Sequence, residues 1–149
     1  MLDVSDFVLP VARVAVELRL TDGSRREVQV FVAAGDDISA LLESPQPFLP
    51  VQDGGKVRLY ARAVMMCVSV PRVPTLVPDG PPPHEREATV HLAGGEQLRG
   101  ILRYVAPRER RRPADYLNEE SRSFALHADH CVHYIAKAHV TCVDEEGRC

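Results

Sequence analysis

A cluster of metal-ligating residue types lies near the carboxyl end of the chain. The run reads His127-Ala-Asp-His130-Cys131-Val-His133. Imidazole nitrogen, thiolate sulfur and carboxylate oxygen are all zinc ligands. If residues 131–136 form a strand, Cys131 and His133 share one face, because alternate side chains of a strand point the same way. The metal candidates are therefore His127, His130, Cys131 and His133, and a solvated, histidine-rich turn is the simpler interpretation.

A basic run is the second feature that could do chemistry. Its arginines are Arg108, Arg110, Arg111 and Arg112. Such a cluster can bind phosphate or an acidic partner, although most are solvated loops. The whole chain has 18 Lys+Arg against 21 Asp+Glu, a net charge of −3. Generic binding to a phosphate backbone needs a basic surface, so we do not expect nucleic acid as the main partner.

Motifs of enzymes and cofactor sites are absent from the sequence. There is no GxSxG, no HExxH and no CxxC pair among the four cysteines. We therefore predict that the protein is not an enzyme and takes no cofactor. The amino terminus is acidic and no apolar run reaches membrane-spanning length, so we predict a cytoplasmic protein without membrane contact.

The elements that would position these residues occur twice in the sequence. Three blocks match in the same order: residues 16–23 with 88–95, residues 38–43 with 113–118, and residues 60–68 with 135–143. Phe48 also matches Phe124 in this alignment. Chance could supply one such block, but three in one order predict a tandem duplication.

Each copy has the pattern of a small strand-rich module. In the first copy, apolar and polar residues alternate over residues 14–20 and 28–32, on either side of Asp22-Gly23, a hairpin turn signal. A short helix over 38–43 and two closing strands, 56–61 and 64–70, follow. The second copy has a strand over 98–105, a helix over 113–118 and closing strands over 131–136 and 138–143. We predict a mainly β fold: a tandem duplication of a five-stranded open barrel, Sm-like or SH3-like, with one short helix per copy.

The domain organisation follows from the repeat and from a proline-rich stretch. Six prolines between residues 71 and 87 favour an extended, semi-rigid spacer. The predicted order is an N-terminal segment (1–12), a first repeat (13–70), a linker (71–87), a second repeat (88–144) and a C-terminal tail (145–149).

Three short motifs of the second copy carry a resemblance to a known family. Asp115-Tyr-Leu-Asn118, Phe124-Ala-Leu126 and Ile135-Ala-Lys-Ala-His-Val140 resemble an uncharacterised bacterial family of small strand-rich modules with the pattern DYLN, RFFPL, VNKxHI. The chain has Ala136 where that family usually has asparagine. The order of strands is also similar to Sm-like barrels, but the Asn-bearing loop and the Arg-Gly pair that contact RNA there have no counterpart in this sequence.

The pattern predicts a protein that binds other proteins. Small open barrels leave unpaired strand edges, which either are blocked or pair with a partner. Pro45, Pro47 and Pro50 predict a blocked edge in the first copy, and the second copy, free of proline after residue 113, predicts an open one. A bond between Cys131 and Cys142 is conceivable if the final hairpin has a two-residue turn. We expect a non-enzymatic adaptor that binds a protein partner or forms a homo-oligomer through strand edges. The alternatives are an Sm-like nucleic-acid binder and a metal sensor.

Overall fold

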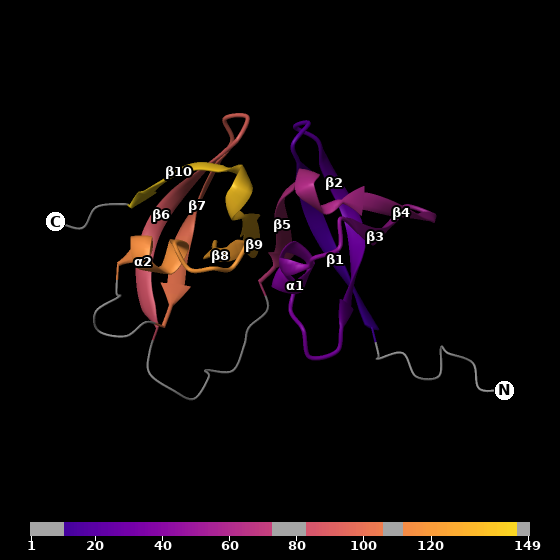
Figure 1. Cartoon of the computed structure of the whole chain (residues 1–149), viewed down its shortest axis with the longest axis horizontal. Coiled ribbons are helices and arrows are strands. Elements are labelled where there is room, and N and C mark those ends of the chain that lie inside the picture. Colours follow the sequence, from indigo (N-terminus) through magenta and orange to yellow (C-terminus); the bar gives the residue numbers. More distant parts are fainter. Residues whose placement is uncertain (1–10, 73–82, 106–111, 146–149) are drawn as a thin grey trace.

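The computed structural model describes residues 11–72, 83–105 and 112–145, and it is mainly β, as predicted (Figure 1). Ten antiparallel strands form one sheet, accompanied by two short α-helices. The first elements are β1 Val11–Leu20, β2 Arg25–Ala33, α1 Ser39–Glu43, β3 Phe48–Asp53, β4 Lys56–Ala61, the 3-10 turn η2 Arg62–Val64 and β5 Met65–Pro71. The others are β6 His84–Leu92, β7 Gln97–Tyr104, α2 Pro113–Leu117, β8 Ser123–His127, β9 Cys131–Ala136, η4 Lys137–His139 and β10 Val140–Glu145.

The β1–β2 hairpin illustrates how local sequence fixes an element. Gly23 has a φ of +88°, a conformation that glycine adopts without a Cβ penalty. The side chain of Asp22 accepts a hydrogen bond from the Ser24 backbone N–H at 2.8 Å, which closes the turn. Apolar residues of β1 then alternate with polar ones, so that Val16, Leu18 and Leu20 are buried.

The strands lie in the order β10-β6-β7-β8-β9-β5-β1-β2-β3-β4. We call residues 11–72 the N-terminal half and residues 83–105 with 112–145 the C-terminal half. Within each half the last strand lies beside the first, so β5 neighbours β1 and β10 neighbours β6. In both halves the register of that pairing shifts once. The shift lies between Arg19 and Leu20 of β1 in the N-terminal half, and between Val140 and Cys142 of β10 in the C-terminal half.

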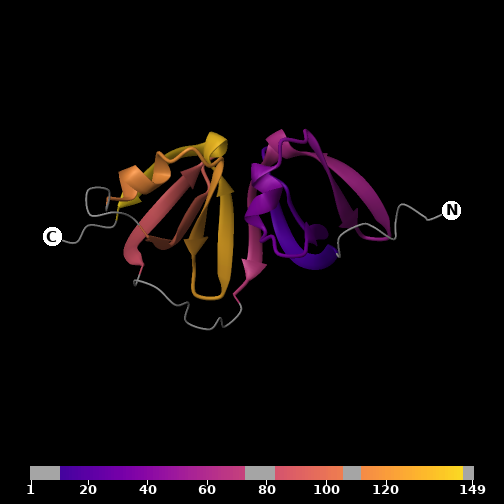
Figure 2. The same ribbon diagram turned by 60° about the horizontal axis from the view of Figure 1, so that its bottom comes forward.

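Each half has its own apolar core. The N-terminal core is formed by β1, β2, α1, β3 and β5, with Leu18, Val30 and Val51 at its centre. The C-terminal core includes Val90, Leu102 and Leu126, all fully buried. Figure 2 shows the two curved lobes side by side, with β5 and β9 between them.

The β5–β9 pairing joins the two lobes into one sheet. It is antiparallel over five residue pairs, from Cys67 opposite Ile135 to Pro71 opposite Cys131. Side chains cross between the cores here: Cys67 belongs to the C-terminal core, whereas Tyr134 packs against the N-terminal one. The halves therefore share a boundary in which each contributes to the other's core.

Several expectations about boundaries and register need correction. Strand β1 begins at Val11 and β6 at His84, inside the ranges predicted as N-terminal segment and linker. Residues 73–82 of the predicted linker lie outside the described residues. The match of Phe48 with Phe124 is wrong by one residue. Phe48 lies opposite Ala61 and Phe124 opposite Ile135, so the counterpart of Phe124 is Leu49. A one-residue slip reverses the face of a strand, and accordingly Phe48 is exposed and Phe124 is buried.

The predicted edges and the conceivable disulfide are also different in the structure. Strand β3, which contains Pro50, lies between β2 and β4, so the open edge of the N-terminal half is the proline-free β4. In the C-terminal half, β10 is the end strand of the sheet as far as the described residues show. Cys131 lies on β9, which pairs with β5 and β8, and Cys142 lies on β10, so these cysteines are on strands that are not neighbours. Both are free thiols.

Candidate functional site

Strand β4 forms one end of the sheet and presents apolar side chains to solvent. Among the described residues, β4 has a single sheet neighbour, β3. The side chains of Val57 and Leu59 are 57% and 68% exposed, and that of Phe48 on the adjoining strand is 56% exposed. These are three of the five large apolar residues exposed in the described part of the chain. An unpaired strand with an apolar surface is the arrangement that pairs with another chain.

Basic residues accompany this apolar surface. Lys56 and Arg58 are both exposed on β4. Behind them, Asp53 accepts a 2.7 Å hydrogen bond from the Tyr60 hydroxyl and a 2.9 Å bond from Arg26. The Tyr60 hydrogen bond, followed by that of Arg26, holds the pKa of Asp53 below its ordinary value. Asp53 therefore stays ionised and fixes Tyr60 in place.

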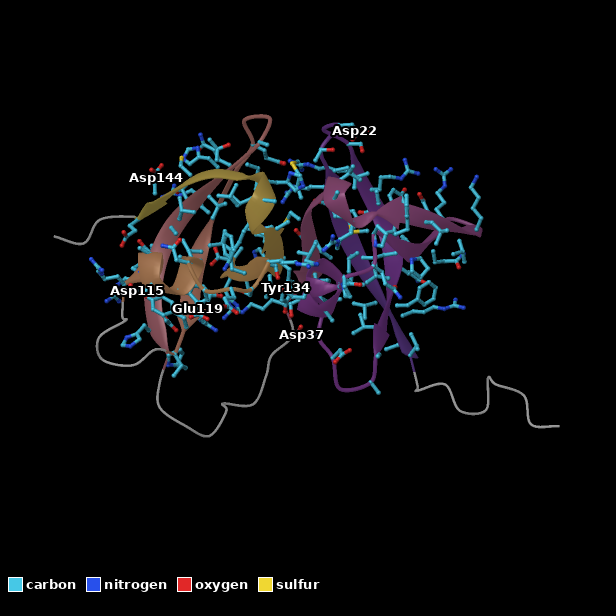
Figure 3. The ribbon with its side chains drawn as sticks, viewed as in Figure 1. Asp22, Asp37, Asp115, Glu119, Tyr134 and Asp144 are labelled. Atoms are coloured by element: carbon cyan, nitrogen blue, oxygen red, sulfur yellow. The ribbon has the colours of Figure 1, made fainter. Side chains whose placement is uncertain are left out.

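Strand β10 forms the opposite end of the sheet and is acidic. Within the described chain it pairs only with β6. Asp144 and Glu145 are exposed, and Val143 is partly buried against the C-terminal core. Figure 3 places Asp144 on the outer side of its lobe, whereas Tyr134 lies where the two lobes meet. The sheet formed by the described residues thus has a basic edge at β4 and an acidic edge at β10.

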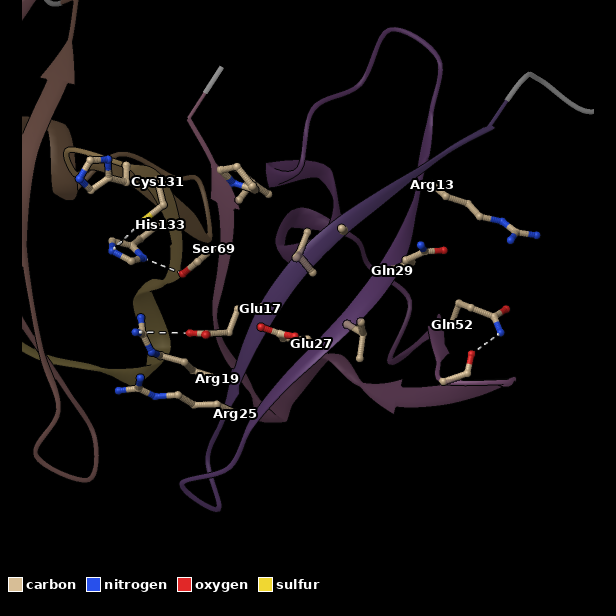
Figure 4. A pocket seen from close by; sticks show the side chains of 17 residues that line it. Arg13, Glu17, Arg19, Arg25, Glu27, Gln29, Gln52, Ser69, Cys131 and His133 are labelled. Carbon is tan, nitrogen blue, oxygen red and sulfur yellow. Dashed lines mark hydrogen bonds and ion pairs between the residues drawn. The ribbon is translucent and has the colours of Figure 1, made fainter. Parts of the chain in front are cut away.

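Strand β5 is the equivalent of β10 in the N-terminal half, and it has a neighbouring strand on its outer side. There, β9 covers β5, and the Ser69 hydroxyl lies 2.6 Å from His133 Nδ1 (Figure 4). Both side chains are buried, with Ser69 8% and His133 7% exposed. Burial, followed by the positive charge of Arg19, lowers the pKa of His133 to about 4. The imidazole is therefore neutral at pH 7 and serves as a hydrogen-bonding group in the junction.

The same junction contains thiols, whose protonation limits their chemistry. Cys131 Sγ lies 3.5 Å from His133 Nε2, and burial raises the pKa of the Cys131 thiol. Burial also raises the pKa of Cys67 to about 11. A nucleophilic cysteine needs a lowered pKa, because the thiolate is the reactive form. The Cys-His-Ser contacts are therefore those of a packed polar junction.

An open groove of about 950 Å³ runs along the outer face of β1 and β2 and ends at this junction (Figure 4). Charged side chains of both signs line it, among them Arg13, Glu17, Arg19 and Glu27. Arg19 forms ion pairs with Glu17 and, across the halves, with Glu96 at 3.2 Å. The lining thus carries arginines and glutamates together, and the groove has no single sign of charge.

The residues predicted as a metal cluster are separated by the strand geometry. His127 ends β8, and His130 lies in the turn before β9. Cys131 and His133 are on β9, and His133 is engaged with Ser69. In the described part of the chain these four residues do not bring three ligand atoms together. Of the predicted basic cluster, Arg108, Arg110 and Arg111 lie outside the described residues, and Arg112 is an exposed residue at the start of α2.

Three other side chains lie close enough together to hold a metal ion. The ligand atoms of His91, Cys142 and Asp144 lie within 4.8 Å of one another. His91 Nε2 is 2.7 Å from Asp144 Oδ2. The group arises because Cys142 lies opposite His91 in the β6–β10 register, and Asp144 follows on the same face. Sequence spacing gave no signal for this group, because His91 and Cys142 are 51 residues apart and only the pairing of two strands brings them together.

No family model matches the chain, and neither does a curated protein or a solved structure. Neither α-helix of the described residues has the length or apolar character that crossing a membrane requires.

Proposed function

We propose that the protein is a non-enzymatic adaptor that binds protein partners by strand addition at its open sheet edges, β4 and β10. The observation that carries the proposal is the exposed apolar surface of Phe48, Val57 and Leu59 at an unpaired edge. An added strand satisfies the free backbone N–H and C=O groups of the edge, and side-chain pockets provide specificity. The proposal keeps the cytoplasmic location expected from the sequence.

The same proposal treats the two halves as a tandem duplication of a five-stranded open barrel of Sm-like or SH3-like type. Support comes from the identical order of strands, helix and 3-10 turn in each half. The equivalent register shifts in β1–β5 and β6–β10 add a detail that the common order of elements does not require. Each barrel alone has two edge strands without a partner. In the full chain, β5, an edge strand of the first copy, pairs with β9, an edge strand of the second copy.

Replacement of Leu59 by lysine tests the adaptor function. The wild-type chain and Leu59→Lys are immobilised and compared for the proteins that each retains from a cytoplasmic extract. Lysine at position 59 removes the most exposed apolar side chain of β4 and adds a third charge to that edge, which weakens strand addition. We therefore expect specific partners to be lost by more than about tenfold. Val105→Lys is the matched control, because Val105 is exposed to a similar extent but lies just after β7, a central strand.

The comparison identifies an edge partner by its pattern of retention. A true partner binds wild type and Val105→Lys equally and does not bind Leu59→Lys. Retained proteins that do not distinguish the three baits contradict the proposal for β4, and the same test with Val143→Lys then decides it for β10.

Metal binding is the second candidate function, and the arrangement of His91, Cys142 and Asp144 favours it. Nitrogen, sulfur and carboxylate ligands together suit zinc. Elemental analysis of the purified chain after incubation with Zn²⁺ and gel filtration tests it. We expect about one zinc per chain, lost in Cys142→Ser and retained in Cys131→Ser. Equal zinc content in the two variants contradicts a site at β10.

A further inference from the structure

The internal junction between β5 and β9 provides a template for the two open edges. Strands β5 and β10 occupy the same place in their halves, and so do β9 and β4. Within the described residues, the two end strands of the sheet, β10 and β4, are therefore the equivalents of the two strands that pair at its centre, β5 and β9. The geometry points to a second copy of this chain as a partner, with β10 of one molecule pairing antiparallel with β4 of the next. The inference rests on the proposed function, since it names the occupant of the same edges.

The register of the pairing between β10 and β4 of two molecules follows from the register of the β5–β9 pairing. In the centre of the sheet, Ser69 faces His133 and Val68 faces Tyr134. His133 is the third residue of β9, as Arg58 is the third residue of β4. Ser69 lies two residues after Cys67, which faces Arg19 on β1. In the same way, Asp144 lies two residues after Cys142, which faces His91 on β6. Ser69 and Asp144 are therefore equivalent positions. The facing pairs between molecules are then Asp144 with Arg58, Val143 with Leu59, and Cys142 with Tyr60.

The charges of the two edges agree with this register. It sets Asp144 opposite Arg58 and diagonally near Lys56, so both close charge pairs have opposite signs. Opposite charges across a strand pair are favourable and like charges are unfavourable. Pairing of β4 with another β4 would bring lysine and arginine together, and pairing of β10 with β10 would bring Asp144 and Glu145 together. The charges thus favour a head-to-tail contact over either symmetric one.

The exposed apolar residues also find partners in this arrangement. Leu59 takes the place of Tyr134, which packs against the core of the neighbouring half. In the second molecule the matching core presents Leu117 and Val143, both only partly buried. Phe48 takes the place of Ser123, which contacts Glu43 of α1. Phe48 would therefore lie beside α2, and the apolar surface of β3 and β4 would be covered.

A head-to-tail contact leaves a free β4 and a free β10 at the ends of every pair. Such heterologous contacts close into a ring when the rotation per molecule permits it and otherwise extend as a filament. The inference therefore predicts species heavier than a dimer, with masses that are multiples of the 16.5 kDa chain.

Charge reversal on each edge separately tests the pairing. The full chain, Arg58→Glu, Asp144→Lys and the double variant are examined by size-exclusion chromatography with light scattering and by circular dichroism. We expect wild type to form multiples and each single variant to be monomeric, because like charges then face each other. The double variant should associate again, because its two reversed charges attract each other.

An equimolar mixture of the two single variants should also associate. The glutamate introduced on β4 of one variant then faces the lysine introduced on β10 of the other, and the unchanged edges pair Arg58 with Asp144. Arg13→Glu and Glu27→Lys, on the central strands β1 and β2, are the matched controls and should behave as wild type.

The outcomes separate this inference from the proposed function. A monomeric wild type at every concentration overturns self-pairing, while retention of another protein through Leu59 still supports the adaptor. Association that persists in both single variants overturns the register. If neither self-association nor any other binding responds to a change in β4 or β10, the adaptor function falls as well. Restoration in the mixture supports the head-to-tail contact even if one single variant is destabilised.

Discussion

In the N-terminal half, β9 covers β5, and the central residues of β5 are Cys67, Val68 and Ser69, all buried. In the C-terminal half, β10 holds the corresponding place, where no strand of the described residues covers it. Its residues there are Cys142, Val143 and Asp144, which are exposed or partly buried. The cysteine and valine are the same, and the serine is replaced by a carboxylate. A neutral hydroxyl suits a buried junction, whereas a charge suits a strand that is solvated or meets an opposite charge.

Replacement of two corresponding valines by aspartate, one in each half, gives the largest expected difference in stability. Val68→Asp places a carboxylate in the N-terminal core and should lower the free energy of unfolding by about 4 kcal/mol. Val143→Asp places it on the open edge and should cost less than about 1 kcal/mol. Urea titration followed by circular dichroism measures both. Equal losses would mean that β10 is as well covered as β5 in the isolated chain.

The contact between β7 and β8 offers a second contrast. A Cβ built on Gly100 would lie 2.6 Å from the His127 carbonyl oxygen and 2.9 Å from Leu126 Cγ. The N-terminal half has Val28 at the corresponding place. We expect Gly100→Ala to cost about 2 kcal/mol, because the backbone must shift. Gly55→Ala, where a Cβ meets no atom within 4 Å, is the control and should change stability by less than about 0.5 kcal/mol. The same thermal or urea unfolding experiment compares them, and equal effects would contradict the close approach.

Acid should destabilise the β5–β9 junction through protonation of His133. The pKa of His133 is lowered to about 4 in the folded protein, against about 6.5 when unfolded. Between these values the unfolded chain binds more protons, so stability is full above pH 6.5 and falls as the pH decreases to about 4. With allowance for solvent screening, the loss attributable to His133 is about 1.5 kcal/mol.

The measurement is the difference in unfolding free energy between wild type and His133→Gln from about pH 7 to about pH 4. That difference should change over this range, because glutamine does not titrate. The corresponding residue of β4 is Arg58, a guanidinium in place of the imidazole, so a junction between molecules would lack this histidine response. A constant difference would show that His133 is solvated.

Local sequence predicted the elements well because their signals are local. Alternation of apolar residues marked β1, and the run at residues 38–43 marked α1 within one residue of its start. The closing strands at 56–61 and 131–136 have the predicted bounds. In each case the periodicity and the turn residues of a short segment sufficed.

Strand partners could not be predicted in the same way, because pairing depends on segments far apart in the chain. The pairing of β5 with β9 joins residues 60 to 68 positions apart, and nothing in either strand specifies the other. The same limit explains why the histidine run offers candidate ligands in the sequence, whereas His91 and Cys142 give no such signal. It also explains the wrong match of Phe48 with Phe124. The two residues are of the same type, but the register of their strands places them one position apart.

The crossing of side chains at the β5–β9 junction has a consequence for folding. Because Cys67 completes the core of the C-terminal half and Tyr134 packs on that of the N-terminal half, neither lobe can lose its structure without uncovering apolar surface in the other. Thermal unfolding should thus be a single cooperative transition with equal calorimetric and van't Hoff enthalpies. Such coupling makes the whole chain, rather than each lobe, the unit that folds.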